Sequence, residues 1–376
     1  MRIAINTRLL IPGHLDGIGW FTAETVRRMV TEHPEHEFIL FFDRQVTLDW
    51  KVENMRQVVL MPPARHPVLW YLFFEWSVTC ALRKYKPDVF LSTDGWMSLK
   101  TKVPTLTVIH DLNFEHATDY LRPSHQRYMK HFFPLFARKA TRVATVSEFS
   151  KEDIAQQYGV AREKIDVVYD GSHNNYQPCD ETTKQRVREQ QCGGNPYYIF
   201  IGTISKRKNL ANILLAFDRF KTDDKQSTQL LVVGNRYWWG DELKVAYDSM
   251  QHQSDVHFIG RAEPAELAQL LSASVALVYP SLFEGFGIPI LEAYFAETAV
   301  ITSNITSMPE VAGEAALLVD PYNVEEIAES MKRLSLSEEL RNSLIEKGRV
   351  QRTLFDWDRT TRLLWQSLMK TYEERQ

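Results

Sequence analysis

The segment 279–293 holds the residues whose types and spacing are best suited to chemistry. It reads Tyr-Pro-Ser-Leu-Phe-Glu-Gly-Phe-Gly-Ile-Pro-Ile-Leu-Glu-Ala and begins where an apolar run ends. Gly285 and Gly287 allow the backbone to turn sharply and to approach a ligand closely. Pro289 fits the first turn of a helix, where its missing N–H costs little. The free amides of such a turn and the helix dipole suit an anion, so the segment predicts a diphosphate site.

Two carboxylates flank this predicted helix start. Glu284 lies just before it, where a sugar attached to the diphosphate would sit, and Glu292 follows eight residues later, one to two turns into the helix. A carboxylate at the second position could accept hydrogen bonds from a ribose diol. As an isolated spacing, such a pair is more often two solvated charges near a helix end, and that alternative stays open at this point.

Short apolar runs alternate with helical patterns along the chain, and these elements must position the segment. The apolar runs predict buried strands at 3–5, 37–42, 89–91, 106–109, 142–146, 165–169, 198–201, 229–233, 256–259, 275–279, 299–302 and 315–319. Helical spacing predicts helices at 21–30, 70–84, 209–220, 264–272, 289–295 and 324–334, and residues 150–153 resemble a capping box. Continuous apolar strands separated by helices are typical of parallel sheets that are covered on both faces.

A polar stretch at 170–196 separates two such series. We interpret it as the connection between domains, with a short helix around 182–190. The prediction is therefore an α/β protein of two doubly wound domains, residues 1–172 and residues 173–355. Ligands of such sheets bind outside the carboxyl ends of the strands, so we expect the two sheets to face each other across a cleft that holds the site.

Composition limits the class of protein. Of the 376 residues, 44% are hydrophobic and 24% are charged, which is ordinary for a globular protein, and the net charge of −4 argues against a nucleic-acid partner. Three cysteines without CxxC spacing, Cys80, Cys179 and Cys192, favour a reducing cytoplasm over a disulfide framework or a cysteine zinc site. The longest apolar stretch, 67–82, is interrupted by polar residues and is too short for a spanning helix.

The segment 279–293 resembles the Glu-x7-Glu signature of the retaining glycosyltransferases of family 4, also called glycosyl transferases group 1, which have the two-domain GT-B fold. Further motifs of that family stand in its order along the chain: Gly17-Ile18-Gly19, Ile109-His110-Asp111, the basic loop 202–209, Ser303-Asn304 with 309–313, and Phe355-Asp356-Trp357. The resemblance implies that 1–172 is the acceptor-side domain and 173–355 the donor domain. It also implies that the C-terminal helix 356–376 crosses back to the first domain.

The resemblance also implies roles for single residues. Arg207 and Lys208 would neutralise the leaving diphosphate, which gains charge in the transition state. His110 would approach the donor sugar, whose hydroxyls Glu284 would hold, and the base would lie beside 258–261 and near 234–236. The remaining donor-binding residues are expected to be Gly17, Gly19, Gly260, Arg261, Gly285, Phe286, Gly287, Ile288 and Glu292. Thr203 and Ala296-Glu297 depart from the family pattern, which shifts phosphate binding toward Arg207 and leaves the helix end undefined.

Structural interpretations compete with these roles. His110 at a strand end is also typical of a hydrogen-bonded structural histidine, and Gly17 with Gly19 could form only a turn. Arg207 and Lys208 could be surface charges, although cations at a helix start oppose its dipole. Asp356-Trp357-Asp358 matches a metal-binding Asp-x-Asp pattern of a different glycosyltransferase fold, but acidic residues also complement a helix start. We expect no metal and no other cofactor.

Residues 61–150 carry a local excess of positive charge. They hold 12 Lys and Arg against 7 Asp and Glu, interleaved with aromatic residues. One interpretation is a surface that contacts anionic lipid and a lipid-linked acceptor. The other is amphipathic helices with aromatic core faces and solvated basic faces.

The predicted activity is retaining hexosyl transfer from a nucleotide-sugar to a glycan or lipid-linked acceptor, as in polysaccharide or O-antigen biosynthesis. The 202–209 loop resembles those of mannosyltransferases, which favours GDP-mannose, with UDP-sugars as the other choice. Two alternatives remain: a sugar-nucleotide epimerase of the GT-B fold and an inactive nucleotide-sugar-binding subunit. We expect a cytoplasmic protein, with peripheral binding at the inner face of the membrane as the open question.

Overall fold

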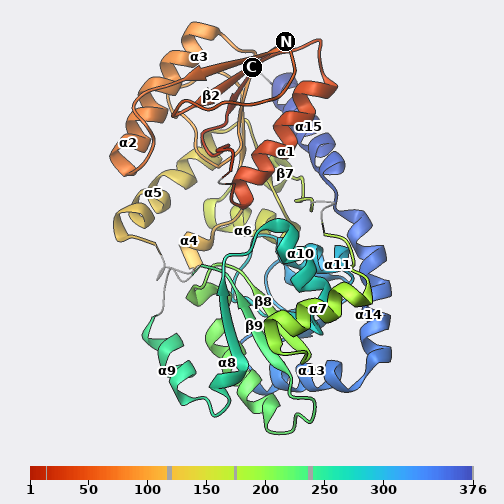
Figure 1. Cartoon of the computed structure of the whole chain (residues 1–376). Coiled ribbons are helices and arrows are strands. Elements are labelled where there is room, and N and C mark those ends of the chain that lie inside the picture. Colours follow the sequence, from red (N-terminus) through yellow and green to blue (C-terminus); the bar gives the residue numbers. More distant parts are fainter. Residues whose placement is uncertain (14, 117–120, 173–175, 236–239, 375–376) are drawn as a thin grey trace. The chain divides into compact units, whose positions relative to one another are not determined.

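Two parallel sheets, one in each half of the chain, organise the structure (Figure 1). The computed structural model describes residues 1–13, 15–116, 121–172, 176–235 and 240–374. The chain divides into a first unit, Met1–Gly171 with Trp357–Gln376, and a second unit, Ser172–Asp356. Each sheet has its own apolar core. The predicted class, two Rossmann-like doubly wound parallel sheets, is confirmed.

The sheet of the first unit has seven strands in the order β3-β2-β1-β4-β5-β6-β7, and every pairing is parallel. The strands are β1 Arg2–Asn6, β2 Glu37–Phe42, β3 Met55–Val59, β4 Val89–Ser92, β5 Thr105–Val108, β6 Arg142–Thr145 and β7 Ile165–Val167. The order reverses between β1 and β4. The chain therefore leaves the carboxyl ends of β1 and β4 in different directions. Doubly wound sheets bind ligands at such a point.

Helices cover both faces of this sheet. They are α1 Gly17–Glu32, α2 Pro67–Leu72, α3 Thr79–Tyr85, α4 Asn113–His116, α5 Pro123–Lys139, α6 Glu148–Tyr158 and α15 Trp357–Glu373. A π-helical segment, Phe73–Val78, joins α2 to α3, so 67–85 forms one irregular helix. Figure 1 shows α1 beside α15, while α2, α3 and α5 lie on the other side of the first unit.

The C-terminal helix α15 is fixed to the first unit by polar contacts. The Asp166 carboxylate on β7 accepts two hydrogen bonds from Arg142, at 2.8 and 2.9 Å, and one from Ser367 of α15 at 2.7 Å. Asp358 at the start of α15 pairs with Arg28 of α1 at 2.7 Å. Helix α15 thus completes the first unit although the chain of the second unit separates the two in sequence.

The sheet of the second unit has six strands in the order β10-β9-β8-β11-β12-β13. The strands are β8 Tyr197–Ile201, β9 Gln229–Val233, β10 Val256–Gly260, β11 Ala276–Tyr279, β12 Ala299–Ser303 and β13 Leu317–Val319. The helices are α7 Glu181–Cys192, α8 Leu210–Lys221, α9 Asp241–Ser249, α10 Pro264–Ala273, α11 Ile288–Phe295, α12 Met308–Ala312, α13 Val324–Leu336 and α14 Glu338–Gln351. The order reverses between β8 and β11, so the loops that leave these two strands meet at the switch point.

The structure corrects several local predictions. Strand β3 was not expected, because its alternating MRQVV sequence lacks a continuous apolar run. The capping residue of α6 is Ser147, whose side chain accepts the Ser150 amide, so the helix begins before the predicted box. The polar stretch 170–196 contains the boundary between the units, at Gly171 and Ser172, and the expected helix is α7, which contacts α10 in the second unit.

Candidate active site

Two loops at the switch point of the second unit carry the predicted catalytic residues. After β8 the chain enters a 3₁₀ turn at Lys206–Lys208 and then α8; after β11 it passes through Glu284 to the start of α11. Because β8 and β11 pair in the sheet, their carboxyl ends are adjacent. The Leu282 amide donates to the Arg207 carbonyl at 2.8 Å, which joins the two loops directly.

Glu284 binds both predicted phosphate cations. Its Oε2 lies 2.6 Å from Arg207 Nη1, and its Oε1 lies 2.6 Å from Lys208 Nζ. The exposed fractions of these side chains are 10% for Glu284, 17% for Arg207 and 12% for Lys208. Burial alone would raise the pKa of the Glu284 carboxyl. The two cations outweigh this effect and lower the pKa to about 2. The cluster is therefore ionised at neutral pH and carries a net charge of +1.

Tyr279 and Phe283 hold this cluster in place. The Tyr279 hydroxyl donates to Glu284 Oε1 at 3.0 Å and accepts a hydrogen bond from Lys208. The Lys208 ammonium also lies 4.7 Å from the centre of the Tyr279 ring. Arg207 donates to the Phe283 carbonyl at 2.6 Å. Tyr279, to which the sequence analysis gave no role, thus hydrogen-bonds to the Glu284 carboxylate and to one of the two cations.

The loop 285–288 is shaped by residues that follow β12. Gly287 has a φ of +110°, and a side chain there would meet the Met308 methyl group at 2.7 Å, so only glycine fits. The Ser307 hydroxyl lies 2.9 Å from the carbonyl oxygens of Glu284 and Phe286, and this contact fixes the loop beneath the carboxylate. Ile288 begins α11. Ser307 was missed, although it lies between two segments that the sequence analysis singled out.

Glu292 lies in the second turn of α11 beside Tyr176. Burial raises the pKa of Glu292 to about 7, and the hydrogen bond from the Tyr176 hydroxyl only partly offsets that effect. At neutral pH this carboxyl therefore exchanges between its protonated and ionised forms. Glu284 and Glu292 belong to one helix start, but their surroundings push their pKa values in opposite directions.

Glycines stand at the carboxyl ends of three neighbouring strands. Gly202 follows β8, Gly234 follows β9, and Gly260 is the last residue of β10. Gly202, Gly234 and Gly260 all have positive φ, and the Gly234 amide donates to the Gly260 carbonyl at 2.7 Å. A Cβ on Gly234 would lie 1.9 Å from the Gly202 carbonyl oxygen. The strand ends therefore approach each other closely where the base was predicted to bind. Arg261 follows as an exposed residue, whereas Arg236 lies outside the described residues.

His110 follows β5 in the first unit and is held in one orientation. Its Nε2 donates to the Thr93 carbonyl at 2.9 Å, and its ring meets the Phe21 ring edge-on at 4.8 Å between centres. Burial lowers the pKa of His110. The neutral ring thus carries its proton on Nε2, and Nδ1 keeps its lone pair as an acceptor.

Gly17 and Gly19 form the first turn of α1, which Asp16 caps. The Gly19 amide donates to Asp16 Oδ1 at 2.8 Å, so a phosphate would have to displace this carboxylate to reach it. A Cβ on Gly19 would lie 3.0 Å from the Leu9 carbonyl oxygen. Close packing against Leu9 and Leu15 therefore favours glycine at position 19, independently of any ligand.

A buried ion pair at the switch point of the first unit was not predicted. Arg8 Nε lies 2.6 Å from Asp94 Oδ2, and Asn6 donates to the same carboxylate at 2.8 Å. The Arg8 guanidinium lies 5.2 Å from the centre of the Trp96 ring. Asn6 ends β1, Arg8 follows it, and Asp94 follows β4. Polar residues at the ends of these two strands were the signal from which the ion pair could have been predicted.

Metal binding and membrane spanning both require features that can be recognised in the described residues. No group of three or more His, Cys, Asp or Glu side chains there could hold a metal ion. Asp358 of the Asp-x-Asp pattern pairs with Arg28 instead. No helix in this part of the chain is both long and apolar enough to cross a bilayer.

Two doubly wound sheets, with a buried acid and two cations at the switch point of the second, define a class: glycosyltransferases of the GT-B fold. Family models agree with this class along most of the chain. The model "Glycosyltransferase Family 4" matches residues 15–172, and the model "Glycosyl transferases group 1" matches residues 181–351. The chain belongs to glycosyltransferase family 4, whose members retain the anomeric configuration and use nucleotide-sugar donors.

Individual relatives show the same likeness. The chain is 27% identical to O-antigen chain mannosyltransferase B of Escherichia coli over 92% of this chain and 94% of that protein. It is 26% identical to O-antigen chain mannosyltransferase RfbU of Salmonella typhimurium over 72% and 74%. The solved structure of Anabaena HepE in complex with UDP and glucose has a TM-score of 0.75, with 16% identity and coverage of 98% and 99%.

Proposed function

We propose that this enzyme transfers a hexosyl residue, with mannose as the first choice, to a glycan or lipid-linked glycan acceptor. GDP-mannose is the favoured donor because two relatives are named as mannosyltransferases. A UDP-sugar is the second choice, since the similar Anabaena fold is solved with UDP and glucose. The relatives' O-antigen names favour polysaccharide synthesis at the inner face of the membrane as the setting.

The arrangement of Glu284, Arg207 and Lys208 is the observation that carries the proposal. The Glu284 carboxylate forms ion pairs with both cations. A bound diphosphate would take over these cations and release Glu284 Oε atoms for the hydroxyls of the sugar. Fixed cations then stabilise the charge that the diphosphate gains as it leaves. Glu292, in its ionised form, would accept hydrogen bonds from the ribose hydroxyls.

Glu284 acts by positioning in this proposal and forms no covalent bond to the sugar. Retention through a covalent intermediate needs a carboxylate nucleophile. The resemblance to family 4 implies front-face attack without a protein nucleophile, and in the donor complex proposed above the Glu284 oxygens accept hydrogen bonds from the sugar hydroxyls. We therefore infer that the acceptor attacks the sugar on the same face from which the diphosphate leaves. The bond from the anomeric carbon to the diphosphate breaks, a bond to the acceptor oxygen forms, and the departing phosphate takes the acceptor's proton.

Thermal melts and turnover with a panel of nucleotide-sugars test this proposal. We expect stabilisation by GDP or UDP, and release of the nucleoside diphosphate that depends on an acceptor. An epimerase would rearrange the donor without any acceptor, and an inactive subunit would bind without turnover.

Neighbouring lysines supply a matched pair of variants for the same experiment. Lys208→Ala should lose both transfer and diphosphate affinity. Lys206→Ala should keep them, because Lys206 pairs with Glu242 at 3.4 Å and is half exposed. Equal diphosphate affinity in both variants would contradict the assignment of Lys208.

A further inference from the structure

The irregular helix 67–85 has two apolar faces, and only one of them is buried. Trp70, Phe73, Phe74, Val78 and Leu82 belong to the core of the first unit. Val68, Leu72 and Trp76 recur every four residues on the opposite face, with exposed fractions of 64%, 41% and 70%. Residues four apart lie on the same side of a helix, so these three form a stripe. Exposed stripes of this kind mark binding surfaces.

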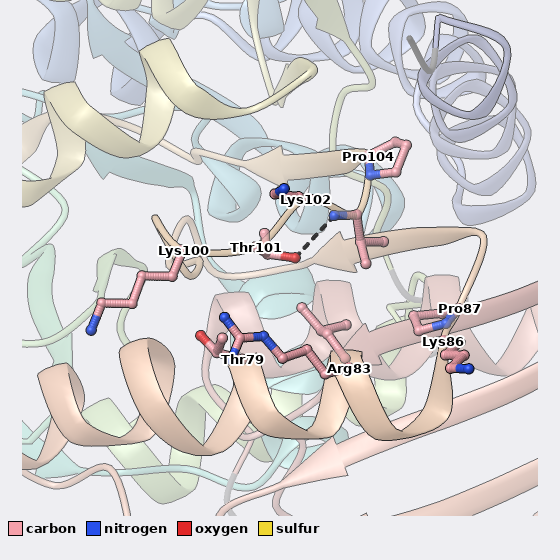
Figure 2. Close-up of a pocket in the computed structure, with 10 residues that line it drawn as sticks. Thr79, Arg83, Lys86, Pro87, Lys100, Thr101, Lys102 and Pro104 are labelled. Atoms are coloured by element: carbon pink, nitrogen blue, oxygen red, sulfur yellow. Dashed lines mark hydrogen bonds between the residues drawn. The ribbon is translucent and has the colours of Figure 1, made fainter.

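A basic pocket adjoins the C-terminal end of this helix. It lies between α3 and the segment 100–104 and has a volume of about 560 Å³ (Figure 2). Its ten lining residues include four cations and no carboxylate: Arg83, Lys86, Lys100 and Lys102. Thr79 and Thr101 also line it, but both are buried and the Thr79 hydroxyl already bonds to the Phe74 carbonyl and Ser98, so the four cations supply the donors. The pocket therefore has the charge and hydrogen-bond donors that a phosphate ester requires.

The four cations of the pocket are exposed, although Lys100 interacts electrostatically with the Glu75 carboxylate. Within the described ranges, no ion pair joins any of them to a carboxylate. The nearby Glu75 side chain is buried and accepts the Leu99 amide at 2.7 Å, so it does not extend toward solvent. The pocket thus presents a positive charge that a partner of opposite charge would complement.

Pocket and stripe form one surface, which we call the docking face. The Lys100 ammonium lies 5.8 Å from the centre of the Tyr71 ring, and Tyr71 is itself 41% exposed next to Leu72. Arg83 lies on the same irregular helix as Trp76, and Figure 2 shows its side chain extending along α3 toward Thr79. Aromatic and aliphatic residues beside clustered cations are the composition of helices that lie in a membrane interface.

We propose that the docking face binds the anionic phospholipids of a bilayer, with phosphate headgroups in the basic pocket and the stripe at the acyl boundary. The pocket lies where β4 and β5 begin, at the edge of the sheet opposite His110 and Arg8. The stripe lies on the same helix as Phe74, whose ring is 5.6 Å from the Arg8 guanidinium. The proposal rests on the proposed function in one respect, because a lipid-linked acceptor explains why the enzyme needs such a surface.

Vesicle co-sedimentation of the full chain tests the docking face. The probes are vesicles of phosphatidylglycerol with phosphatidylcholine, and of phosphatidylcholine alone, at low and raised salt. Each cation near an anionic surface contributes about fivefold in affinity. The double variant Lys100→Glu/Lys102→Glu should therefore bind anionic vesicles more than tenfold more weakly. Trp76→Ser should weaken binding at both salt concentrations, since its contribution is apolar.

Matched variants in the second unit serve as controls. Lys225→Glu/Lys347→Glu changes the net charge equally at two exposed lysines, and Leu336→Ser removes a side chain that is 73% exposed. Both should bind vesicles like the wild type. Equal loss in the test and control pairs would show that only net charge matters, and would overturn the docking face. Inorganic phosphate at millimolar concentration should not displace the vesicles; stabilisation by phosphate without vesicle binding would mean a soluble ligand and would also overturn it.

Catalytic assays separate this proposal from the proposed function. Nucleotide affinity and transfer to a soluble acceptor, both measured without vesicles, should be unchanged in the docking variants. If the wild type binds vesicles but transfers no sugar to any acceptor, the docking face stands and the proposed function fails. If transfer proceeds but neither vesicle type binds the wild type, the docking face fails alone.

Discussion

Replacing Glu284 with glutamine should separate stability, diphosphate binding and turnover, because one carboxylate contributes to each of them differently. The variant keeps the shape of the side chain and removes its charge. Arg207 and Lys208, both largely buried, then lose their anionic partner. The cluster changes from a net charge of +1 to +2, with no anion left in it.

The size of the effect on stability follows from the Glu284 pKa. A fall from 4.5 to about 2 corresponds to about 3 kcal/mol of net favourable interaction for the ionised form. The folded-state pKa is depressed, so this stabilisation is fully present above pH 4.5 and is lost as the pH falls toward 2. At pH 7 we therefore expect Glu284→Gln to lower the free energy of unfolding of the second unit by about 3 kcal/mol, or roughly 6–12 °C in Tm.

Diphosphate affinity should change in the opposite direction. In the wild type the ligand must displace Glu284 from both cations, whereas in the variant these two ion pairs are already lost. We expect Glu284→Gln to bind GDP or UDP about tenfold more tightly or better, and the ligand to restore much of the lost stability. Turnover should nevertheless fall by about 10²–10³, since the sugar hydroxyls lose their acceptor.

Calorimetric melts, titration with the nucleoside diphosphate and turnover with the intact donor measure the three properties. Glu242→Gln is the control, because its pair with Lys206 is exposed and should contribute little. Near-normal turnover by a folded Glu284→Gln protein would refute the catalytic assignment. Unchanged or weaker diphosphate binding would refute the assignment of Arg207 and Lys208 to the phosphates.

Three further predictions concern other parts of the structure. Donor affinity should rise with pH up to about pH 7, at most about tenfold per unit, because the ribose needs the ionised form of Glu292; the slope should vanish in Glu292→Gln, and calorimetry of both proteins at pH 6 to 8 checks this. Gly234→Ala should prevent folding of the second unit or abolish nucleotide binding, since its Cβ would overlap the Gly202 carbonyl, whereas Gly260→Ala has open space and should cost about 1 kcal/mol in thermal melts. Asp166→Ala should destabilise the first unit by about 3 kcal/mol and expose α15 to limited proteolysis; an unchanged digestion pattern would contradict its role in anchoring that helix.

Local sequence patterns were sufficient for the fold class. Continuous apolar strands separated by helices are required when a parallel sheet is buried on both faces, so most strands of both units were predictable from the pattern of apolar runs. Edge strand β3 was not predicted, because a strand with one neighbour needs no continuous apolar run. The helix start after Glu284 was predictable as well, since glycine and proline restrict the backbone locally.

The contacts within the site depended on the tertiary structure. Arg207 and Glu284 are 77 positions apart in the sequence, and they meet only because the strand order reverses between β8 and β11. For the same reason the sequence could name the acid and the cations separately but could not reveal that they neutralise one another. The opposite pKa shifts of Glu284 and Glu292 likewise come from burial and neighbouring charges, which residue types and spacing do not specify.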